Sequence, residues 1–143
     1  GEYGLLMLAL GYHVQFADLP SHSLDFLRWR LARRGYNFQK MVYVIGVDPL
    51  PKVEIVWCMD VLEHLPQAEH ESFLSMLAGM GSSVCVNLVL DPKADGGLHH
   101  AVDAEGLTRF CAERWPTYAE DMHDGKVRFL IYGDALKMGE KPK

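Results

Sequence analysis

Three apolar segments of this 143-residue chain end at or beside a carboxylate. Asp18 closes Tyr12–Asp18 (YHVQFAD), Asp48 follows Met41–Val47 (MVYVIGV), and Asp60 follows Val53–Met59 (VEIVWCM). In open parallel sheets, ligands bind beyond the carboxyl ends of the strands, so these acids are candidate ligand contacts. An acid placed like Asp18 can bind both hydroxyls of a ribose. It can equally cap the helix expected to begin near Ser21, and the residues alone leave both interpretations open.

Histidines lie near these predicted strand ends. His64 belongs to Cys58–Pro66 (CMDVLEHLP), and His99 and His100 close the loop Asp91–His100 (DPKADGGLHH). A histidine beside an acceptor hydroxyl or amine can take its proton as a general base. The alternative, which we favour for His64, is a histidine that fixes its turn by a hydrogen bond.

No metal site is predicted. His99 and His100 are adjacent, and adjacent residues of an extended loop point in opposite directions. The three cysteines, Cys58, Cys85 and Cys111, form no CxxC pair and lie in apolar stretches, so we expect buried free thiols. We expect His70 at the surface.

The apolar segments alternate with segments of helical period. A further apolar strand is predicted over Ser83–Leu90 (SVCVNLVL). Helices are predicted over residues 5–9, from Ser21 to Gly35, from Gln67 to the glycines at 79 and 81, and from Asp103 to Trp115. Uniformly apolar strands between helices are typical of a parallel sheet with both faces covered.

The chain closes with a predicted hairpin. Asp124-Gly125 is a strong hairpin signal, and Val127–Tyr132 (VRFLIY) is rich in strand-forming residues. The predicted fold is therefore α/β, a doubly wound, mostly parallel sheet with a C-terminal antiparallel hairpin. We expect one domain over residues 1–136 and a frayed tail over 137–143.

Composition narrows the classes of function. Apolar residues make up 49% and charged residues 23% of the chain, as in ordinary globular domains. The net charge of −5 argues against a nucleic-acid partner, since phosphate binding requires a basic face. No apolar run approaches the roughly 18 residues of a membrane span, and no signal peptide opens the chain, so we predict a cytoplasmic location.

The segment Cys58–Pro66 resembles the D-V-L-E-H-L segment that follows the fourth strand of class I S-adenosylmethionine-dependent methyltransferases. Other segments match this family in order along the chain. They are Gly1-Glu2-Tyr3 (the last glycine of a G-x-G-x-G loop), Asp18 (the acid after the second strand), Val44–Pro51 (VIGVDPLP, the stretch beside the adenine) and 98–115 (the late loop and helix).

The resemblance implies methyl transfer from S-adenosylmethionine to an acceptor, which we expect to be a small molecule. It implies His64, His99 and His100 as candidate catalytic residues. The implied cofactor contacts are Gly1, Glu2, Asp18, Leu19, Val47, Asp48, Cys58, Met59 and Asp60. Within this set, the acid beside the adenine could align with either Asp48 or Val47.

The family's first strand has no counterpart after Gly1. In that fold it lies at the centre of the sheet, between the strands assigned here to Tyr12–Asp18 and Val53–Met59. Its absence would leave unpaired backbone groups, so we expect an upstream segment, or a second chain, to complete the sheet, or else the sheet to be rearranged. Of these, we favour an upstream segment. A non-catalytic methyltransferase-like module is an alternative. A third interpretation is a nicotinamide-dependent oxidoreductase, because Asp18 could also bind the ribose of a dinucleotide. The terminal hairpin and the D-V-L-E-H-L segment disfavour it.

Overall fold

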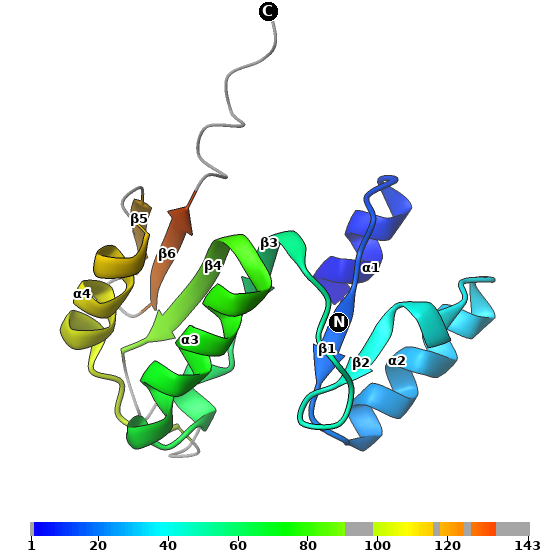
Figure 1. Ribbon diagram of the computed structural model, residues 1–143, viewed down its shortest axis with the longest axis horizontal. Coiled ribbons are helices and arrows are strands. Elements are labelled where there is room, and N and C mark those ends of the chain that lie inside the picture. Colours follow the sequence, from blue (N-terminus) through cyan, green and yellow to red (C-terminus); the bar gives the residue numbers. More distant parts are fainter. Residues whose placement is uncertain (1, 91–98, 116–117, 125–126, 134–143) are drawn as a thin grey trace, which may run out of the picture. The chain divides into compact units, whose positions relative to one another are not determined.

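The computed structural model describes residues 2–90, 99–115, 118–124 and 127–133. The chain divides into two compact units, Gly1–Pro51 and Lys52–Lys143 (Figure 1). Each unit has its own sheet and its own core. The single domain expected over 1–136 therefore stays a prediction, and the expected tail lies outside the described residues.

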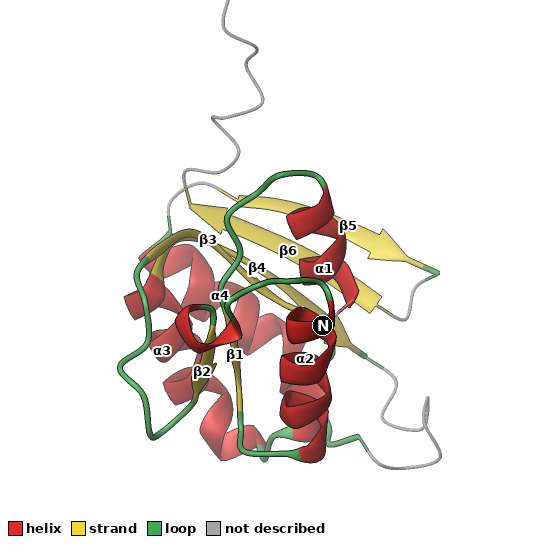
Figure 2. Cartoon of the chain, turned by 90° about the vertical axis from the view of Figure 1, so that its right-hand side faces the viewer, coloured by secondary structure: helices red, strands yellow, loops and turns green. Residues whose placement is uncertain are grey.

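The first unit is a two-stranded parallel sheet with helices. Its elements are α1 (Glu2–Ala9), β1 (Phe16–Asp18), α2 (His22–Arg33), a short 3-10 helix (Phe38–Lys40) and β2 (Val42–Val44). Strands β1 and β2 run side by side with α2 against them (Figures 1 and 2). Their small core consists of Leu5, Phe16, Leu24, Leu31 and Val42.

Helix α2 begins and ends where the sequence predicts. Ser21 is the N-cap, and its hydroxyl accepts a hydrogen bond from the Leu24 backbone N–H at 3.2 Å. Just after the helix, Gly35 takes a positive φ of 80°, which a glycine adopts without a steric cost. The alternative that Asp18 caps this helix is wrong, because Ser21 occupies the cap.

Both strands of the first unit are shorter than predicted. Tyr12–Asp18 and Met41–Val47 were expected as strands, but three residues of each are paired. At the end of β2 the chain turns back. The Asp48 backbone N–H donates to the Val44 carbonyl at 2.9 Å, and Gly46 has a φ of 83°. An apolar run marks buried residues, so it does not reveal where such a turn interrupts the ladder.

The second unit holds a four-stranded sheet in the order β3-β4-β6-β5. Its strands are β3 (Val53–Cys58), β4 (Gly81–Val89), β5 (Tyr118–His123) and β6 (Val127–Gly133). Strands β3 and β4 are parallel, whereas β6 pairs antiparallel with both β4 and β5. The predicted C-terminal hairpin is thus confirmed, with Asp124 at a φ of 51° in its turn.

Two helices cover one face of this sheet. They are α3 (His70–Met80) and α4 (Ala104–Arg114), both on the same side of β4 and β6 (Figure 1). As predicted, Asp103 caps α4, with its Oδ1 accepting from the Gly106 N–H at 2.9 Å. The core between helices and sheet includes Leu74, Leu77, Val84, Val86, Leu88, Leu107, Cys111, Leu130 and Tyr132. Burying each large aliphatic side chain contributes about 1.5–3 kcal/mol.

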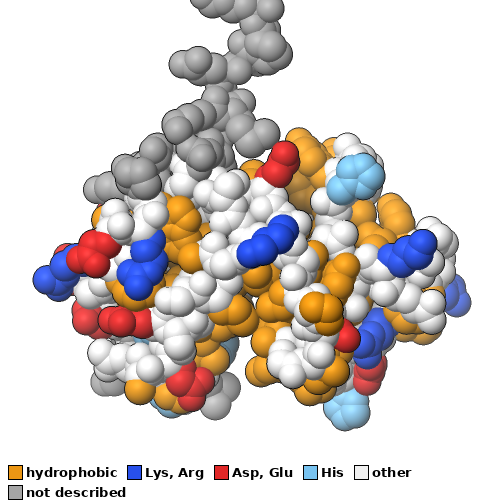
Figure 3. Space-filling model, in the orientation of Figure 1, with side chains coloured by type: hydrophobic (Ala, Val, Ile, Leu, Met, Phe, Trp, Pro, Cys, Tyr) orange, Lys and Arg blue, Asp and Glu red, His pale blue; other side chains and the backbone are white. Residues whose placement is uncertain are grey.

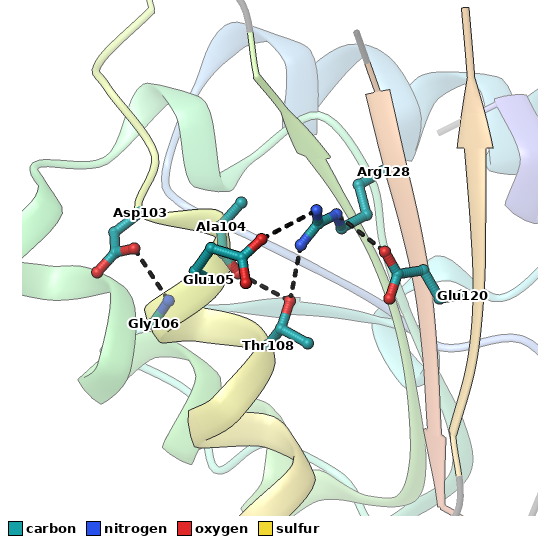
Figure 4. A network of polar contacts seen from close by, with 7 residues as sticks. All are labelled: Asp103, Ala104, Glu105, Gly106, Thr108, Glu120 and Arg128. Carbon is teal, nitrogen blue, oxygen red and sulfur yellow. Dashed lines mark hydrogen bonds and ion pairs between the residues drawn. The ribbon is translucent and has the colours of Figure 1, made fainter. Parts of the chain in front are cut away.

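Arg128 of β6 joins α4 to the hairpin (Figure 4). Its guanidinium forms ion pairs with Glu105 at 3.2 Å and Glu120 at 3.0 Å. It also donates to the Thr108 hydroxyl at 3.3 Å, and that hydroxyl donates to the Ala104 carbonyl at 2.7 Å. One half-buried cation therefore binds a helix and two strands together.

Strand β3 is open on one side. Among the described strands, β3 pairs only with β4, and β1 pairs only with β2. The apolar side chains of Ile55 and Trp57 on β3 are 44% and 54% exposed. This arrangement agrees with the prediction that the central strand of the resembled fold is not supplied by these residues. Among the described helices, none is long and apolar enough to cross a membrane.

Candidate functional site

The turn after β3 is fixed by a pair of hydrogen bonds between Asp60 and Asn87. The Asp60 backbone N–H donates to Asn87 Oδ1 at 2.7 Å, and Asn87 Nδ2 donates to Asp60 Oδ1 at 2.6 Å. Asp60 has a φ of 55°, a left-handed conformation that aspartate and asparagine tolerate better than most residues. The polar turn at the carboxyl end of β3 is thus held in one conformation.

Asn87 is a site residue that the sequence analysis missed. It lies on β4, the parallel neighbour of β3, where the register pairs Cys58 with Val86. Asn87 is only 4% exposed, and a buried amide must be hydrogen-bonded to be tolerated. The available signal was a single amide within the apolar segment SVCVNLVL.

The D-V-L-E-H-L segment forms a short 3-10 helix over Leu62–His64. Leu62 and Glu63 are each 1% exposed, whereas the His64 side chain is exposed. Leu62 packs into the core of the second unit, which anchors the helix directly after the Asp60 turn. The local pattern therefore buries one carboxylate and presents one imidazole.

The structure brings His64 and His99 together. Their ring centroids lie 4.9 Å apart, with the rings in an edge-to-face arrangement. The neighbouring His100 is attached through its backbone, because its N–H donates to the Glu63 carbonyl at 2.7 Å, and its side chain is exposed. Residues 91–98 of the predicted loop lie outside the described residues.

Cys58 and Met59 are half-buried at the end of β3. Burial, with smaller contributions from the negative charges of Glu63 and Asp60, raises the pKa of the Cys58 thiol to about 12. Cys58 is therefore a neutral thiol at physiological pH and a poor nucleophile. As predicted, all three cysteines are free, and Cys85 and Cys111 are buried.

In the first unit, Asp18 is exposed at the end of β1. Its Oδ1 accepts a hydrogen bond from the backbone N–H of Leu19 at 2.8 Å, and Leu19 is 57% exposed. This short local bond holds the carboxylate beside the end of the strand. The ribose contact that the resemblance implies for Asp18 stays a prediction.

The other predicted cofactor contacts of the first unit differ in their surroundings. Asp48 Oδ2 accepts from the Val44 N–H at 2.7 Å, so its carboxylate stabilises its own turn, and Val47 is 75% exposed. Glu2 is exposed in the first turn of α1, and its Oε1 lies 3.8 Å from Nη1 of Arg30. Gly1 lies outside the described residues.

His70 is buried, so the expectation of a surface position is wrong. It is 1% exposed at the start of α3, and its Nε2 lies 3.0 Å from the Leu65 carbonyl oxygen. The bond joins α3 to the end of the D-V-L-E-H-L segment. In the sequence, His70 is a polar residue beside the predicted start of a helix, and this pattern does not indicate a contact with the Leu65 carbonyl.

Comparison with known proteins places the fold. No protein-family model and no curated protein sequence matches the chain. Solved structures do match it. One is magnesium protoporphyrin IX methyltransferase from Synechocystis PCC 6803 with bound SAM, with a TM-score of 0.63 and 13% identity over 88% of this chain. The fold is that of the class I methyltransferases.

Two further solved structures are similar to the chain in fold. The PH0226 protein from Pyrococcus horikoshii has a TM-score of 0.71 and 12% identity, covering 93% of this chain and 78% of its own. The O-methyltransferase NcsB1 of neocarzinostatin biosynthesis, in complex with S-adenosylmethionine and 2-hydroxy-5-methyl naphthoic acid, has a TM-score of 0.60 and 20% identity, covering 93% and 46%. The chain spans 62% of the Synechocystis enzyme.

Proposed function

We propose that this chain belongs to an enzyme that transfers a methyl group from S-adenosylmethionine to a small-molecule acceptor. The observation that carries the proposal is the fixed turn at Asp60, which Asn87 holds at the carboxyl end of β3. Ligands of open α/β sheets bind at this end of the strands. Bound S-adenosylmethionine in two similar folds supports the assignment of the cofactor.

S-adenosylmethionine would supply a methyl carbon already activated by its positively charged sulfur. The protein then has to align donor and acceptor and exclude water, and it needs no fixed catalytic triad. In this proposal, the carboxylate of Asp18 accepts hydrogen bonds from the ribose. The backbone groups of the Cys58–Asp60 turn line one side of the cofactor site. The thiol of Cys58 is neutral and adds no charge there.

The histidines near this turn are the candidates for proton removal from the acceptor. His64, His99 and His100 come from two segments that the structure joins through the bond from His100 to Glu63. A neutral imidazole within hydrogen-bond reach of an acceptor hydroxyl can accept its proton. The grouping supports a base role for one of them.

A small molecule fits the charge of the chain better than a nucleic acid does. The net charge is −5, and acidic and basic side chains of the second unit lie side by side on the face shown in Figure 3. A phosphate backbone would require a continuous basic surface. The 2-hydroxy-5-methyl naphthoic acid bound to NcsB1 is one kind of molecule to include in a screen.

A further strand is part of the proposal. The open edge of β3 favours a strand, from an upstream segment or a second chain, that pairs with β3. Such a strand would satisfy the unpaired backbone groups of the edge. Cofactor binding by the 143 residues alone should then be weak.

Calorimetric titration with S-adenosylhomocysteine tests the proposal. On a form that includes any native residues upstream of Gly1, Asp18→Ala should weaken binding by about 10- to 100-fold, since a hydrogen bond to a charged group contributes about 1.5–3 kcal/mol. Asp25→Ala is the matched control, because Asp25 is an exposed acid of the same unit that pairs with Arg28 on α2. Equal affinities for the two variants would refute the role of Asp18.

The alternative is a non-catalytic methyltransferase-like module. Its support is Asp48, whose carboxylate is engaged by its own turn. This alternative predicts no heat of binding for S-adenosylhomocysteine in the extended form. Incubation with methyl-labelled S-adenosylmethionine and candidate acceptors then separates a binding module from an enzyme.

A further inference from the structure

Beside the Asp60 turn, a buried carboxylate and two imidazoles converge. Glu63 and His64 of the 3-10 helix and His99 from the segment before α4 each offer one ligand atom, and these atoms lie within 4.8 Å of one another. The cluster joins residues separated by more than 30 positions in the sequence. We propose that it binds a divalent metal ion of the zinc, cobalt or iron(II) type.

The state of Glu63 is the independent observation. Glu63 is 1% exposed, and its buried Oε2 has no hydrogen-bond partner among the residues that the structure describes. Leaving a buried charged group unpaired costs several kcal/mol, and such groups are found paired or bound to metal. Among the described residues of the second unit, Arg128 forms ion pairs with Glu105 and Glu120 and not with Glu63. A cation between Glu63 and the imidazoles would satisfy this oxygen.

The donor set determines the class of metal. Two imidazoles and one carboxylate are borderline ligands that suit zinc and divalent iron, cobalt or nickel, whereas magnesium and calcium favour all-oxygen sets. Donors bound at about 2.0–2.2 Å around one ion lie roughly 3–3.5 Å apart, so the cluster must contract slightly on binding. The exposed side chain of His64 is free to make that adjustment.

This inference departs from the prediction of no metal site. That prediction considered His99 together with its neighbour His100, whose side chain is exposed. The structure instead pairs His99 with His64, and the backbone bond from His100 to Glu63 fixes the two segments relative to each other. His99 lies more than 30 positions after Glu63 and His64, so the sequence gave no indication that the three residues meet.

Three protein ligands leave coordination positions open for water or for an oxygen of a bound acceptor. That consequence rests on the proposed methyl transfer, whereas binding of the ion does not. If His64 and His99 bind metal, their ligating nitrogens accept no proton, and His100 remains the imidazole available as a base. Metal binding can be measured without cofactor or acceptor, so the two proposals can fail separately.

The test is titration of the chelator-treated chain with zinc chloride, followed by calorimetry, with magnesium chloride as the comparison. We expect one saturable zinc site and no comparable magnesium site. Substitution of a neighbour of a metal ligand already costs 10- to 100-fold in affinity, so loss of a ligand should cost at least about tenfold. His64→Gln, His99→Gln and Glu63→Gln should each show this loss.

His100→Gln is the matched control, since it removes an adjacent exposed histidine outside the cluster. Unchanged zinc affinity in His64→Gln and His99→Gln, or no saturable binding, would overturn the proposal. Titration with cobalt(II) gives an absorption spectrum that reports the types of ligand. Near-ultraviolet sulfur-to-cobalt bands would mean that Cys58 is a ligand and would overturn the proposed donor set. Circular dichroism melting without metal checks that each variant folds. If Glu63→Gln fails to fold, His64→Gln still tests the proposal, because His64 is exposed and its substitution should leave the fold intact.

Discussion

Asn87 bonds both the backbone and the carboxylate of Asp60, so a buried side chain of β4 fixes a residue that follows β3. The two contacts are reciprocal, because each residue donates one hydrogen bond and accepts one. They span 27 positions of the sequence. A turn held in this way depends on the parallel pairing of its two strands, and disruption of either strand should release it.

Loss of the Asn87 amide should destabilise the second unit. Asn87→Ala leaves the Asp60 N–H without its partner and opens a small space in the sheet. We expect the free energy of unfolding in urea to fall by about 1–3 kcal/mol. Asn37→Ala is the control, because Asn37 is exposed and makes no side-chain cap, and its effect should stay within about 0.5 kcal/mol. Equal losses in the two variants would contradict the assigned role.

Asp60 should tolerate asparagine but not valine. Asparagine keeps an oxygen for Asn87 Nδ2 and accepts the left-handed backbone, whereas valine offers no acceptor and resists a φ of 55°. The left-handed conformation costs roughly 1–2 kcal/mol for an ordinary residue, and the lost bond adds to this. Thermal melts should place Asp60→Asn near the parent chain and Asp60→Val well below it. A stable Asp60→Val variant would argue against a fixed turn.

Cys58 should react slowly with iodoacetamide. Its pKa of about 12, against an ordinary value of 9.0, lowers the thiolate fraction near pH 8 about a thousandfold. Peptide mass spectrometry measures the rate of Cys58 alkylation in the native chain and in the chain unfolded in urea. Glu63→Gln removes one charge that raises the pKa of Cys58 and should speed the native reaction. Glu71→Gln, at an exposed residue in the first turn of α3, should not.

The raised thiol pKa also predicts the direction of a pH effect on stability. Because the folded pKa of Cys58 exceeds the unfolded value, its contribution is fully present below pH 9 and is lost as the pH rises toward 12. Burial raises the pKa of Cys111 in the same direction, to about 11. Urea midpoints should therefore fall between pH 9 and pH 11. A rise over that range would contradict the burial of these thiols.

Arg128 should not be replaceable by methionine. The substitution removes two ion pairs and the bond to Thr108, and it leaves the 15%-exposed site without its cation. Solvent moderates the effect, because Glu105 is mostly exposed and Glu120 is partly exposed, so we expect a loss of about 1–2 kcal/mol in urea unfolding. Arg109→Met, at an exposed arginine of α4, should change stability by less than about 0.5 kcal/mol.

Local patterns in the sequence predicted most elements of the second unit. The apolar strands, the Asp103 cap and the Asp124 hairpin depend on near neighbours, and the structure has all three. The limits of β1 and β2 were harder to predict, because apolar residues continue past the point where pairing stops. Hydrophobic period reports burial, whereas strand ends depend on hydrogen bonds.

The polar contacts around the site depend on tertiary structure. Asn87 was missed because its partner Asp60 is 27 residues away, and His70 was misjudged because its partner is a backbone carbonyl. In the sequence, Glu63 is a charged residue next to a histidine, and this local pattern gave no indication that it would be 1% exposed. The resemblance placed the segment correctly, but it gave no information on which side chains would meet.

The stacking of Trp115 on Tyr132 has an optical consequence. Their stacked rings, with centroids 5.6 Å apart, give the second unit a shielded indole, while Trp29 in the first unit is 54% exposed. Trp115 should emit at shorter wavelength than Trp29. With the exposed Trp57 replaced by phenylalanine, the two fluorophores report separately on the two units. Whether one unit melts before the other can then be read from intrinsic fluorescence alone.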